Sequence, residues 1–340
     1  MTSERTPARE LIELMNGFWK TQAVYMAADC GVIDRIAAEP GSRAGELAVR
    51  LGLDPDALGR LLVFLESLDV VSGGDQEGDG YQLTPVGELL RTGVPDSMRD
   101  HVRIYGDYFY QSWSALAHSL RTGRSAFTEV FGADLFSYLN QHPETSLMYE
   151  RAMVAGTPFF SRISEVHDFS RARRIVDVAG GHGALLVEIL KAVPGPQAVL
   201  FDAPHVIEEA ARHPIATDHA DRCERVGGDF FAGVPEDGDV YLLSRILHCF
   251  DDEACLRILG NCRRAMAPGA RLVIVERLLA KTPGSSLSQG YNMHMLVVLG
   301  GGRERSESEY HTLLEKAGFA VEAVRELPLE VQLLVAAALP

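Results

Sequence analysis

Residues 173–183 read RRIVDVAGGHG, and this stretch is the strongest indication of the fold class. An apolar run ends in an acid, and a cluster of glycines follows it within three residues. Residues 184–193, ALLVEILKAV, then place apolar side chains at helical spacing. A buried strand, a tight glycine turn and a helix are the elements with which α/β proteins bind nucleotide-like ligands. The stretch therefore predicts an α/β domain with a ligand site at its glycine turn.

The glycine cluster lacks the spacing that binds a dinucleotide. That fingerprint requires a third glycine three residues after the second, because the helix must pack closely on the strand. Counted from Gly181 and Gly183, this position is Leu186. The turn is therefore expected to bind a ligand without a pyrophosphate, which disfavours an NAD-dependent dehydrogenase.

The C-terminal half alternates between strand and helix patterns. Further strand candidates are residues 197–202, 222–229, 239–244 and 271–279, and most segments between them suit helices. This alternation predicts a doubly wound parallel sheet. Residues 319–327 and 331–339 are separated only by a short turn at Pro328, so the last strand is expected to run antiparallel.

The N-terminal region predicts a winged-helix-like unit. Residues 8–40 have helical spacing, residues 42–71 read as helix, glycine turn and helix, and residues 72–90 read as a Gly/Asp-rich hairpin. Arg60 is the only strong base on the second helix, whereas a helix that reads DNA needs several Arg, Lys, Asn or Gln side chains. We expect a structural or dimerising role, and a winged-helix regulator is the alternative.

Composition narrows the class of protein. The chain has 340 residues and a net charge of −15, which disfavours binding to nucleic acid or to anionic membranes. Its N-terminus has no signal-like apolar core and no long apolar run occurs, so a cytoplasmic location is expected. The five cysteines form no C-x-x-C pair, so neither a disulfide framework nor a zinc site is expected.

Three domains are predicted from these patterns. Residues 1–95 form the winged-helix-like dimerisation domain, residues 96–165 a helical linker and substrate-pocket region, and residues 166–340 the catalytic domain. The middle region is rich in aromatic residues, most of which are expected to pack in cores. Among them, Phe160 is expected to line a flat apolar substrate pocket, because such pockets often lie at domain junctions.

Six motifs follow one another along the chain: DVAGGHG, VLFDAPHV, GDFF, LSRILHCFDDEAC, VIVERLL and GGRERSESEYHTLLEKAGF. In this order the chain resembles the S-adenosylmethionine-dependent O-methyltransferases of the plant caffeic-acid and isoflavone type and of bacterial antibiotic tailoring. The resemblance covers nearly the whole chain. It implies a Rossmann-like class I methyltransferase sheet of seven strands with the last antiparallel, and a homodimer formed through the N-terminal domain.

The predicted cofactor site begins at the glycine turn. Gly180, Gly181 and Gly183 allow the backbone to approach the methionine part of the cofactor. Asp202 ends the next strand about 20 residues further on, where a carboxylate can accept both ribose hydroxyls.

The resemblance implies the remaining cofactor contacts. Asp229 is expected to bind the adenine amino group, and the ring of Phe230 to pack on adenine. Ser244 stands where plant members carry a lysine that contacts the cofactor. Met153 lies in a helix that the family places near the sulfonium.

The resemblance also implies a catalytic set of His248, Glu276 and Glu304. A phenol has a pKa near ~10 and an imidazole near ~6.5, so a neutral histidine can remove the phenolic proton. A carboxylate that accepts from one ring nitrogen fixes the tautomer and steadies the imidazolium. Taken singly, the two acids read as a strand-end glutamate and as a loop glutamate paired with Arg303 or Arg305.

Two departures concern the acceptor. Most family members read His-Asp-Trp where this chain reads His248-Cys249-Phe250. This difference predicts either an acceptor other than the usual vicinal diol or an apolar substituent near Cys249. Asn292 stands where an Asp is common. The predicted pocket comprises Cys249, Tyr291, Asn292, His294, Met295, Leu299 and Phe160. His294 is a rival base, and no metal is implied, since no acid cluster with magnesium spacing accompanies the glycine turn.

The sequence thus predicts methyl transfer from S-adenosylmethionine, with S-adenosylhomocysteine as product, to a phenolic hydroxyl of a small aromatic secondary metabolite. The alternatives are aromatic C-methylation, or a decarboxylation or hydroxylation, on the same fold. The dehydrogenase and the DNA-binding regulator are more remote.

Overall fold

A computed structural model describes residues 6–74, 80–94, 96–155, 157–279 and 287–340. The chain divides into two compact units. Unit one comprises Met1–Gln111 and Leu139–Gly156, and unit two comprises Ser112–Tyr138 and Thr157–Pro340. The chain passes from one unit to the other within α8 (Tyr110–Ser114) and α11 (Leu135–Gln141). The three-domain division at residues 95 and 165 stays a prediction.

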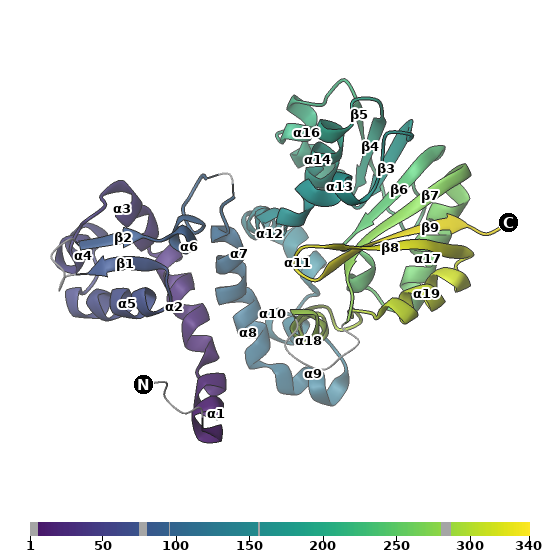
Figure 1. Ribbon diagram of the computed structural model, residues 1–340. Coiled ribbons are helices and arrows are strands. Elements are labelled where there is room, and N and C mark those ends of the chain that lie inside the picture. The colour runs from purple at the N-terminus through teal and green to yellow at the C-terminus, as the bar shows by residue number, and fades with distance from the viewer. Residues whose placement is uncertain (1–5, 75–79, 95, 156, 280–286) are drawn as a thin grey trace. The chain divides into compact units, whose positions relative to one another are not determined.

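Unit one is mostly helical (Figure 1). Its elements are α1 (Pro7–Met15), α2 (Gly17–Asp29), α3 (Val32–Ala38), α4 (Ala44–Leu51), α5 (Pro55–Ser67), β1 (Val71–Gly74), β2 (Gly80–Leu83), α6 (Pro85–Glu88), α7 (Arg99–Ile104), η1 (Tyr105–Phe109) and α12 (Pro143–Ala155). Gly52 ends α4 in the left-handed region at φ 67°, and the Asp54 side chain caps α5. Antiparallel pairing of Val71 with Leu83 begins the β1–β2 hairpin. The helix pair and the hairpin predicted for residues 42–90 are thus present.

The core of unit one lies among α2 to α5 and the hairpin, with Ile33, Leu47, Leu62 and Leu65 at 0–1% exposure. In contrast, α1 buries no residue, although it is amphipathic. Large apolar side chains of α1 and α2 remain exposed: Leu11, Ile12, Leu14, Met15, Phe18 and Trp19. Within the described residues, no helix is long and apolar enough to cross a membrane.

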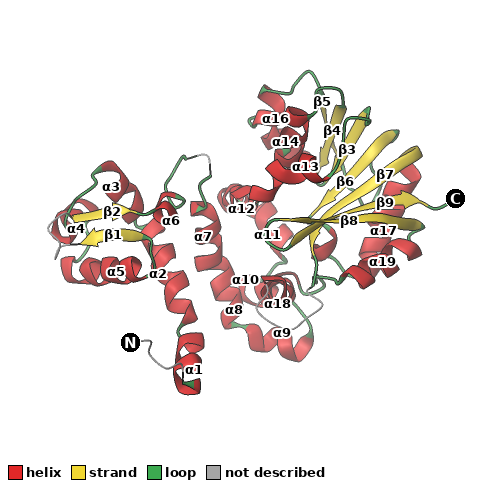
Figure 2. Ribbon diagram, in the orientation of Figure 1, coloured by secondary structure: helices red, strands yellow, loops and turns green. Residues whose placement is uncertain are grey.

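Unit two contains a sheet with helices on both faces, as Figure 2 shows. Its elements are α9 (Leu116–Thr122), α10 (Ala126–Phe131), η2 (Pro158–Arg162), α13 (Ile163–Val166), β3 (Arg174–Val178), α14 (Ala184–Ala192), β4 (Gln197–Asp202), α15 (Pro204–Ala210), α16 (Pro214–Thr217), β5 (Cys223–Gly227), β6 (Gly238–Ser244), η3 (Leu247–Cys249), α17 (Asp252–Ala265), β7 (Met266–Arg277), α18 (Leu287–Leu299), α19 (Glu307–Lys316), β8 (Phe319–Leu327) and β9 (Val331–Ala338).

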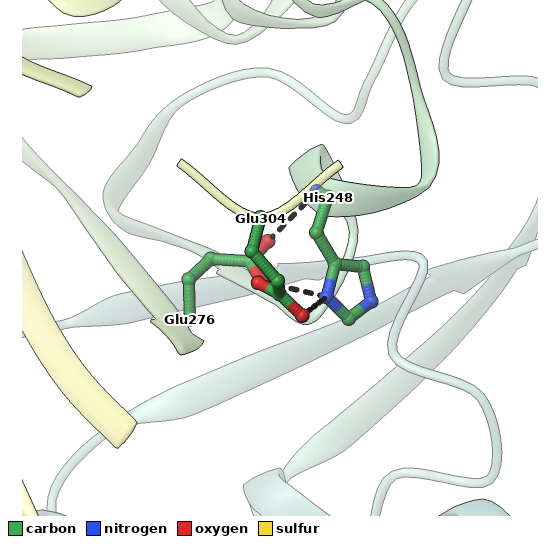
Figure 3. Close-up of side chains that lie close together, drawn as sticks. All are labelled: His248, Glu276 and Glu304. Carbon is green, nitrogen blue, oxygen red and sulfur yellow. Dashed lines mark hydrogen bonds and ion pairs between the residues drawn. The ribbon is translucent and has the colours of Figure 1, made fainter. Parts of the chain in front are cut away.

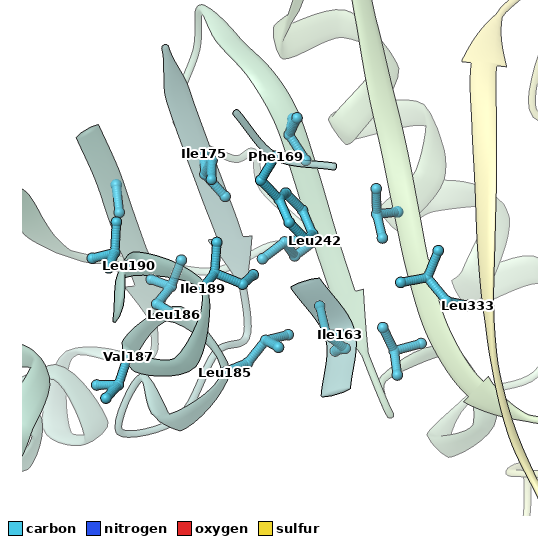
Figure 4. Close-up of a cluster of buried hydrophobic side chains, with 14 of the residues drawn as sticks. Ile163, Phe169, Ile175, Leu185, Leu186, Val187, Ile189, Leu190, Leu242 and Leu333 are labelled. Atoms are coloured by element: carbon cyan, nitrogen blue, oxygen red, sulfur yellow. The ribbon is translucent and has the colours of Figure 1, made fainter. Parts of the chain in front are cut away.

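Alternating side chains of the strands build a core on each face of this sheet. On one face, Ile175 and Leu242 pack with Leu186 and Ile189 of α14 (Figure 4). On the other face, Val176 and Leu243 and their neighbours pack against α17 and α19. The inner strands β3, β4 and β6 therefore read as nearly continuous apolar runs, as expected where a sheet is buried on both sides.

In the described part of the chain, the sheet has seven strands in the order β5-β4-β3-β6-β7-β9-β8. The first five strands in this order are parallel, while β9 runs antiparallel to both β7 and β8. The predicted sheet and its antiparallel last strand are confirmed. The chain reverses its direction of winding between β3 and β6, and ligands bind at the carboxyl ends of strands beside such a reversal.

Candidate active site

The glycine turn between β3 and α14 depends on the absence of side chains. Gly181 and Gly183 have φ values of 59° and 78°, which side-chain-bearing residues rarely adopt. A Cβ on Gly180 would stand 2.5 Å from a carboxylate oxygen of Asp177, and a Cβ on Gly183 would stand 2.8 Å from Ile215. The turn therefore exposes backbone where a ligand can approach it closely.

Asp202 lies beside this turn at the end of β4. Its Oδ2 accepts from the backbone N–H of Gly181 at 2.8 Å, and its Oδ1 accepts from that of Ala203 at 2.7 Å. These two bonds hold the carboxylate beside the glycine turn, and its role as a ribose ligand stays a prediction.

Asp177 is a buried acid that the sequence reading did not select as a site residue. It is 1% exposed, and neither carboxylate oxygen has a hydrogen-bond partner among the described residues. Burial raises its pKa to about 8, and Asp202 adds to the effect. Ser244, at the end of β6, likewise has a buried Oγ without a partner in the described part of the chain. These orphaned polar atoms at strand ends, together with the side-chain-free turn, fit a polar nucleoside ligand.

Asp229 and Phe230 follow β5, in the loop that leads toward β6. Asp229 is exposed, and its Oδ1 accepts from the backbone N–H of Phe231 at 2.8 Å. The ring of Phe230 lies 5.9 Å from that of Phe250, measured between centroids. Met153 is half-buried in α12 of unit one, and its predicted place near the sulfonium stays a prediction.

His248 lies in η3, just after β6, and contacts two buried carboxylates (Figure 3). Its Nδ1 is 3.2 Å from Oε1 of Glu304 and 3.3 Å from Oε2 of Glu276. Both glutamates are 0% exposed, whereas the histidine side chain is 12% exposed. The structure thus brings together the three side chains that the sequence placed on separate segments.

These contacts set the charge of the cluster. Burial by itself lowers the pKa of His248, but the neighbouring Glu276, Cys249 and Glu304 raise it well above the ordinary 6.5. Burial raises the pKa of Glu276 above 4.5, although His248 opposes this shift. The buried carboxylates therefore stabilise the imidazolium that His248 forms when it takes up a proton.

The two glutamates are themselves fixed by their surroundings. Oε1 of Glu276 accepts the backbone N–H groups of Leu247 at 2.8 Å and of His248 at 3.3 Å. The backbone N–H of Glu304 donates to Oδ1 of Asn292 at 3.1 Å.

Among the described residues, neither neighbouring arginine forms an ion pair with Glu304. Arg303 pairs with Glu309 and Asp252, and Arg305 pairs with Asp252. The geometry therefore favours the histidine as the partner of Glu304, rather than Arg303 or Arg305.

The predicted pocket residues of α18 make defined contacts. His294 is buried, and its Nδ1 accepts from the indole N–H of Trp113 at 3.1 Å. The guanidinium of Arg277 lies 4.0 Å from the ring centroid of Tyr291.

The other pocket candidates differ in surroundings. Met295 is buried, and Leu299 borders an open cavity of about 430 Å³ with residues of α9 and α10. The thiol of Cys249 lies 3.7 Å from the carbonyl oxygen of Arg245. Phe160 packs on the core beside α14, against Phe159.

Comparisons with known proteins identify the family of the chain. Residues 113–320 match the family model of the O-methyltransferase domain, and residues 12–93 match that of the O-methyltransferase dimerisation domain. The 3-amino-4-hydroxybenzoate 4-O-methyltransferase of Streptomyces cremeus is 73% identical over 97% of this chain and 90% of its own length.

Solved structures resemble the whole chain. The crystal structure of LaPhzM has a TM-score of 0.92 at 36% identity, covering 98% of this chain and 100% of its own. Human N-acetylserotonin methyltransferase, solved in complex with SAM, has a TM-score of 0.91 at 28% identity with full coverage of both chains. The chain therefore belongs to the O-methyltransferase family, and it is an S-adenosylmethionine-dependent O-methyltransferase with a dimerisation domain at its N-terminus.

Proposed function

We propose that this enzyme methylates a phenolic hydroxyl of a small aromatic acceptor, with His248 as the general base. The observation that carries the proposal is the position of the His248 Nδ1 atom, which faces Glu276 and Glu304 at 3.3 and 3.2 Å. Glu304 accepts at Nδ1, and the carboxylate of Glu276 lies 3.3 Å from the same nitrogen, so the proton of the neutral ring is held there. The lone pair then lies on Nε2, where it can accept the phenolic proton.

The protein's share of the chemistry is alignment and proton removal. Bound S-adenosylmethionine supplies a methyl group on a sulfonium, which is already a good leaving group. His248 takes the acceptor proton at Nε2, and the buried carboxylates of Glu276 and Glu304 stabilise the imidazolium that forms. Burial of the cluster keeps water from weakening these interactions.

The cofactor is assigned to the edge of the sheet around the glycine turn. Asp202 is proposed to accept the ribose hydroxyls, and Asp177 offers a buried carboxyl group beside the turn. The remaining residues of the proposed site are Gly180, Gly181, Gly183, Asp229, Phe230, Ser244 and Met153.

We infer that the acceptor is a benzoic acid with an amino group beside the reacting hydroxyl. The support is the 73% identity to a 3-amino-4-hydroxybenzoate 4-O-methyltransferase. Cys249 agrees with an acceptor that is not a vicinal diol, since a thiol cannot replace the charge of the usual Asp. Tyr291, Asn292, His294, Met295 and Leu299 are proposed to line its pocket, and no metal is required.

The experiment is product analysis with [methyl-¹³C]S-adenosylmethionine and 3-amino-4-hydroxybenzoate. An O-methyl carbon resonance in the product, formed equally well in the presence of EDTA, supports the proposal. An N-methyl or ring C-methyl resonance would overturn the oxygen assignment, and loss of turnover in EDTA would overturn metal independence. C-methylation remains the second candidate, because a phenolate made by His248 also activates the ring carbon beside it.

We further infer a homodimer formed through unit one. The exposed apolar side chains of α1 and α2, among them Leu14 at 78% and Met15 at 64%, form a face that a second copy would bury. Sedimentation of the wild type and of a Leu14→Glu variant tests this, and a wild-type monomer contradicts it. The net charge of −15 supports the absence of nucleic-acid and membrane partners, and the cytoplasmic location stays a prediction.

A further inference from the structure

Arg305 is an arginine buried beneath the turn that carries His248. Its side chain is 0% exposed, and it follows Glu304 directly in the chain. Its Nη1 donates to the carbonyl of Leu247, and its Nη2 donates to the carbonyl of Phe250, each at 2.9 Å. One rigid guanidinium therefore bridges the backbone on both sides of His248 and Cys249.

An acid on the solvent side, Asp252, balances the positive charge of Arg305. Its Nε and Nη2 donate to Oδ1 of Asp252 at 3.0 and 2.7 Å, and the side chain of Asp252 is 53% exposed. Two further N–H groups, one on Nη1 and one on Nη2, donate inward to the backbone carbonyls. Burying a guanidinium is costly, and an apolar side chain would fill the same volume without that cost. The planar fork is what an apolar residue or a lysine cannot reproduce.

Glu276 and Arg305 hold complementary backbone groups of the same turn. Glu276 accepts the N–H groups of Leu247 and His248, while Arg305 donates to the carbonyls of Leu247 and Phe250. The carbonyl of His248 accepts from the backbone N–H of Arg303 at 2.8 Å. The backbone around the imidazole is thus held from both of its hydrogen-bonding sides.

We propose that Arg305 is a positioning residue, which fixes the backbone of residues 247–250 so that the His248 ring stays against Glu276 and Glu304. The inference rests on the proposed role of His248 as base. Arg305 acts through the turn and through its covalent neighbour Glu304. Because a displacement of about 1 Å at a reacting group can cost ~100-fold in rate, loosening this turn is expected to slow turnover.

The test compares Arg305→Lys, which keeps the charge, with Arg305→Met, which keeps only the volume. Arg222→Lys is the matched control, because the half-buried Arg222 side chain also bridges two carbonyls, those of Leu190 and Val193, outside the proposed site. For each purified full-length variant we would measure kcat against pH, the Kd of S-adenosylhomocysteine by calorimetry, and the melting temperature.

Arg305→Lys is expected to lower kcat about 10- to 100-fold and to leave the Kd for S-adenosylhomocysteine within about twofold. The rise of kcat with pH should also move to lower pH, because a displaced imidazole loses the carboxylates that raise its pKa. Loss of the positive charge alone would move this rise to higher pH. The direction in which the pH profile of kcat moves therefore distinguishes a displaced imidazole from the loss of a positive charge. Arg222→Lys should change only the melting temperature.

The proposal is overturned if Arg305→Lys folds and keeps the kcat and the pH profile of the wild type. It is also overturned if Arg305→Met moves the profile only to higher pH at unchanged maximal kcat, since that is an effect of charge. If Arg305→Met fails to fold, Arg305→Lys decides. A His248→Gln variant with normal turnover would instead refute the base assignment itself, so the two failures are distinguishable.

Discussion

The backbone N–H of Gly181 donates to the carboxylate of Asp202 across 2.8 Å. This bond joins the glycine turn after β3 to the end of the neighbouring strand β4. The two features that the sequence singled out for the cofactor thus form one hydrogen-bonded structure. The acid orients the turn, and the turn holds the acid at the carboxyl edge of the sheet.

Replacing Asp202 by Asn is expected to weaken S-adenosylhomocysteine binding by about 10- to 100-fold, because hydrogen bonds to a charged group contribute ~1.5–3 kcal/mol. Calorimetric titration measures the change. Asp221→Asn is the control, since this acid is exposed and lies before β5. Equal affinities for the wild type and Asp202→Asn would exclude the ribose role.

Replacing His248 by Ala should reduce kcat by about 10²- to 10⁴-fold, the usual contribution of a general base. The affinity for S-adenosylhomocysteine should hardly change, because the imidazole serves the acceptor. Steady-state kinetics and calorimetry separate the two effects. The exposed His311→Ala variant should behave as the wild type. Near-normal turnover of His248→Ala would refute the assignment.

Glu276→Gln should move the pH profile of kcat. The carboxylate of Glu276 raises the pKa of His248, so its loss lowers that pKa. A base works in its neutral form, and the rise of kcat with pH should therefore shift to lower pH. The plateau should fall as well, because the imidazolium loses a stabilising charge. The amide oxygen can still accept the N–H groups of η3, so the fold is retained. An unshifted profile would mean that the two groups are not coupled.

Asp177 predicts a pH-dependent stability. Its pKa is about 8 in the folded protein against an ordinary 3.8. As pH rises, Asp177 loses its proton in the unfolded chain before it does so in the folded protein. The contribution of protonated Asp177 to the free energy of unfolding is therefore complete below about pH 4 and is lost as pH rises to about 8.

Replacing Asp177 by Asn removes the titratable group, so the variant should not show this loss of stability as pH rises. At pH 9 the variant should be more stable than the wild type by up to roughly 5 kcal/mol, since each pKa unit corresponds to ~1.4 kcal/mol. At pH 4 the two should unfold alike. Thermal denaturation at both pH values, beside Asp221→Asn, tests this. A stability difference independent of pH would contradict it.

His294 should donate a hydrogen bond to the methyl-accepting substrate, and it should not act as the base. Its Nδ1 accepts from Trp113, so the neutral ring carries its proton on Nε2. His294→Phe should raise KM for the acceptor and leave the pH profile of kcat unchanged. If His294→Phe abolishes the rise of kcat with pH, while His248→Ala keeps it, the rival base is correct.

Much of the fold could be predicted because its signals are local. Residues 197–202 and 319–327 form strands with the predicted bounds. The first is buried and leaves an apolar run. The second is largely exposed, and its bounds are marked by the short turn at Pro328. Strand β7 begins at Met266, earlier than the apolar run from residue 271, because Met266 pairs with Gly238 at an irregular point of the ladder. Such pairing depends on a neighbouring strand and leaves no mark in the segment itself.

The candidate site divides in the same way. The glycine turn and Asp202 were found from spacing, and His248, Glu276 and Glu304 from resemblance. Three features were not predicted from the sequence. They are the hydrogen bonds of Arg305 to the turn at residues 247–250, the buried carboxyl group of Asp177, and the bond between Trp113 and His294. Trp113 and His294 are 181 residues apart. For Asp177, an acid inside a buried apolar strand was the signal available.

By itself, the sequence determined the class of fold, the position of the glycine turn and the family, because apolar periodicity and short motifs are properties of contiguous residues. Only the tertiary structure decided which acids touch which ring nitrogen and which arginine lies beneath the turn. Those relationships arise where the ends of β6 and β7 and the segment before α19 meet. Burial there turns ordinary charged side chains into a coupled set, since water no longer screens them.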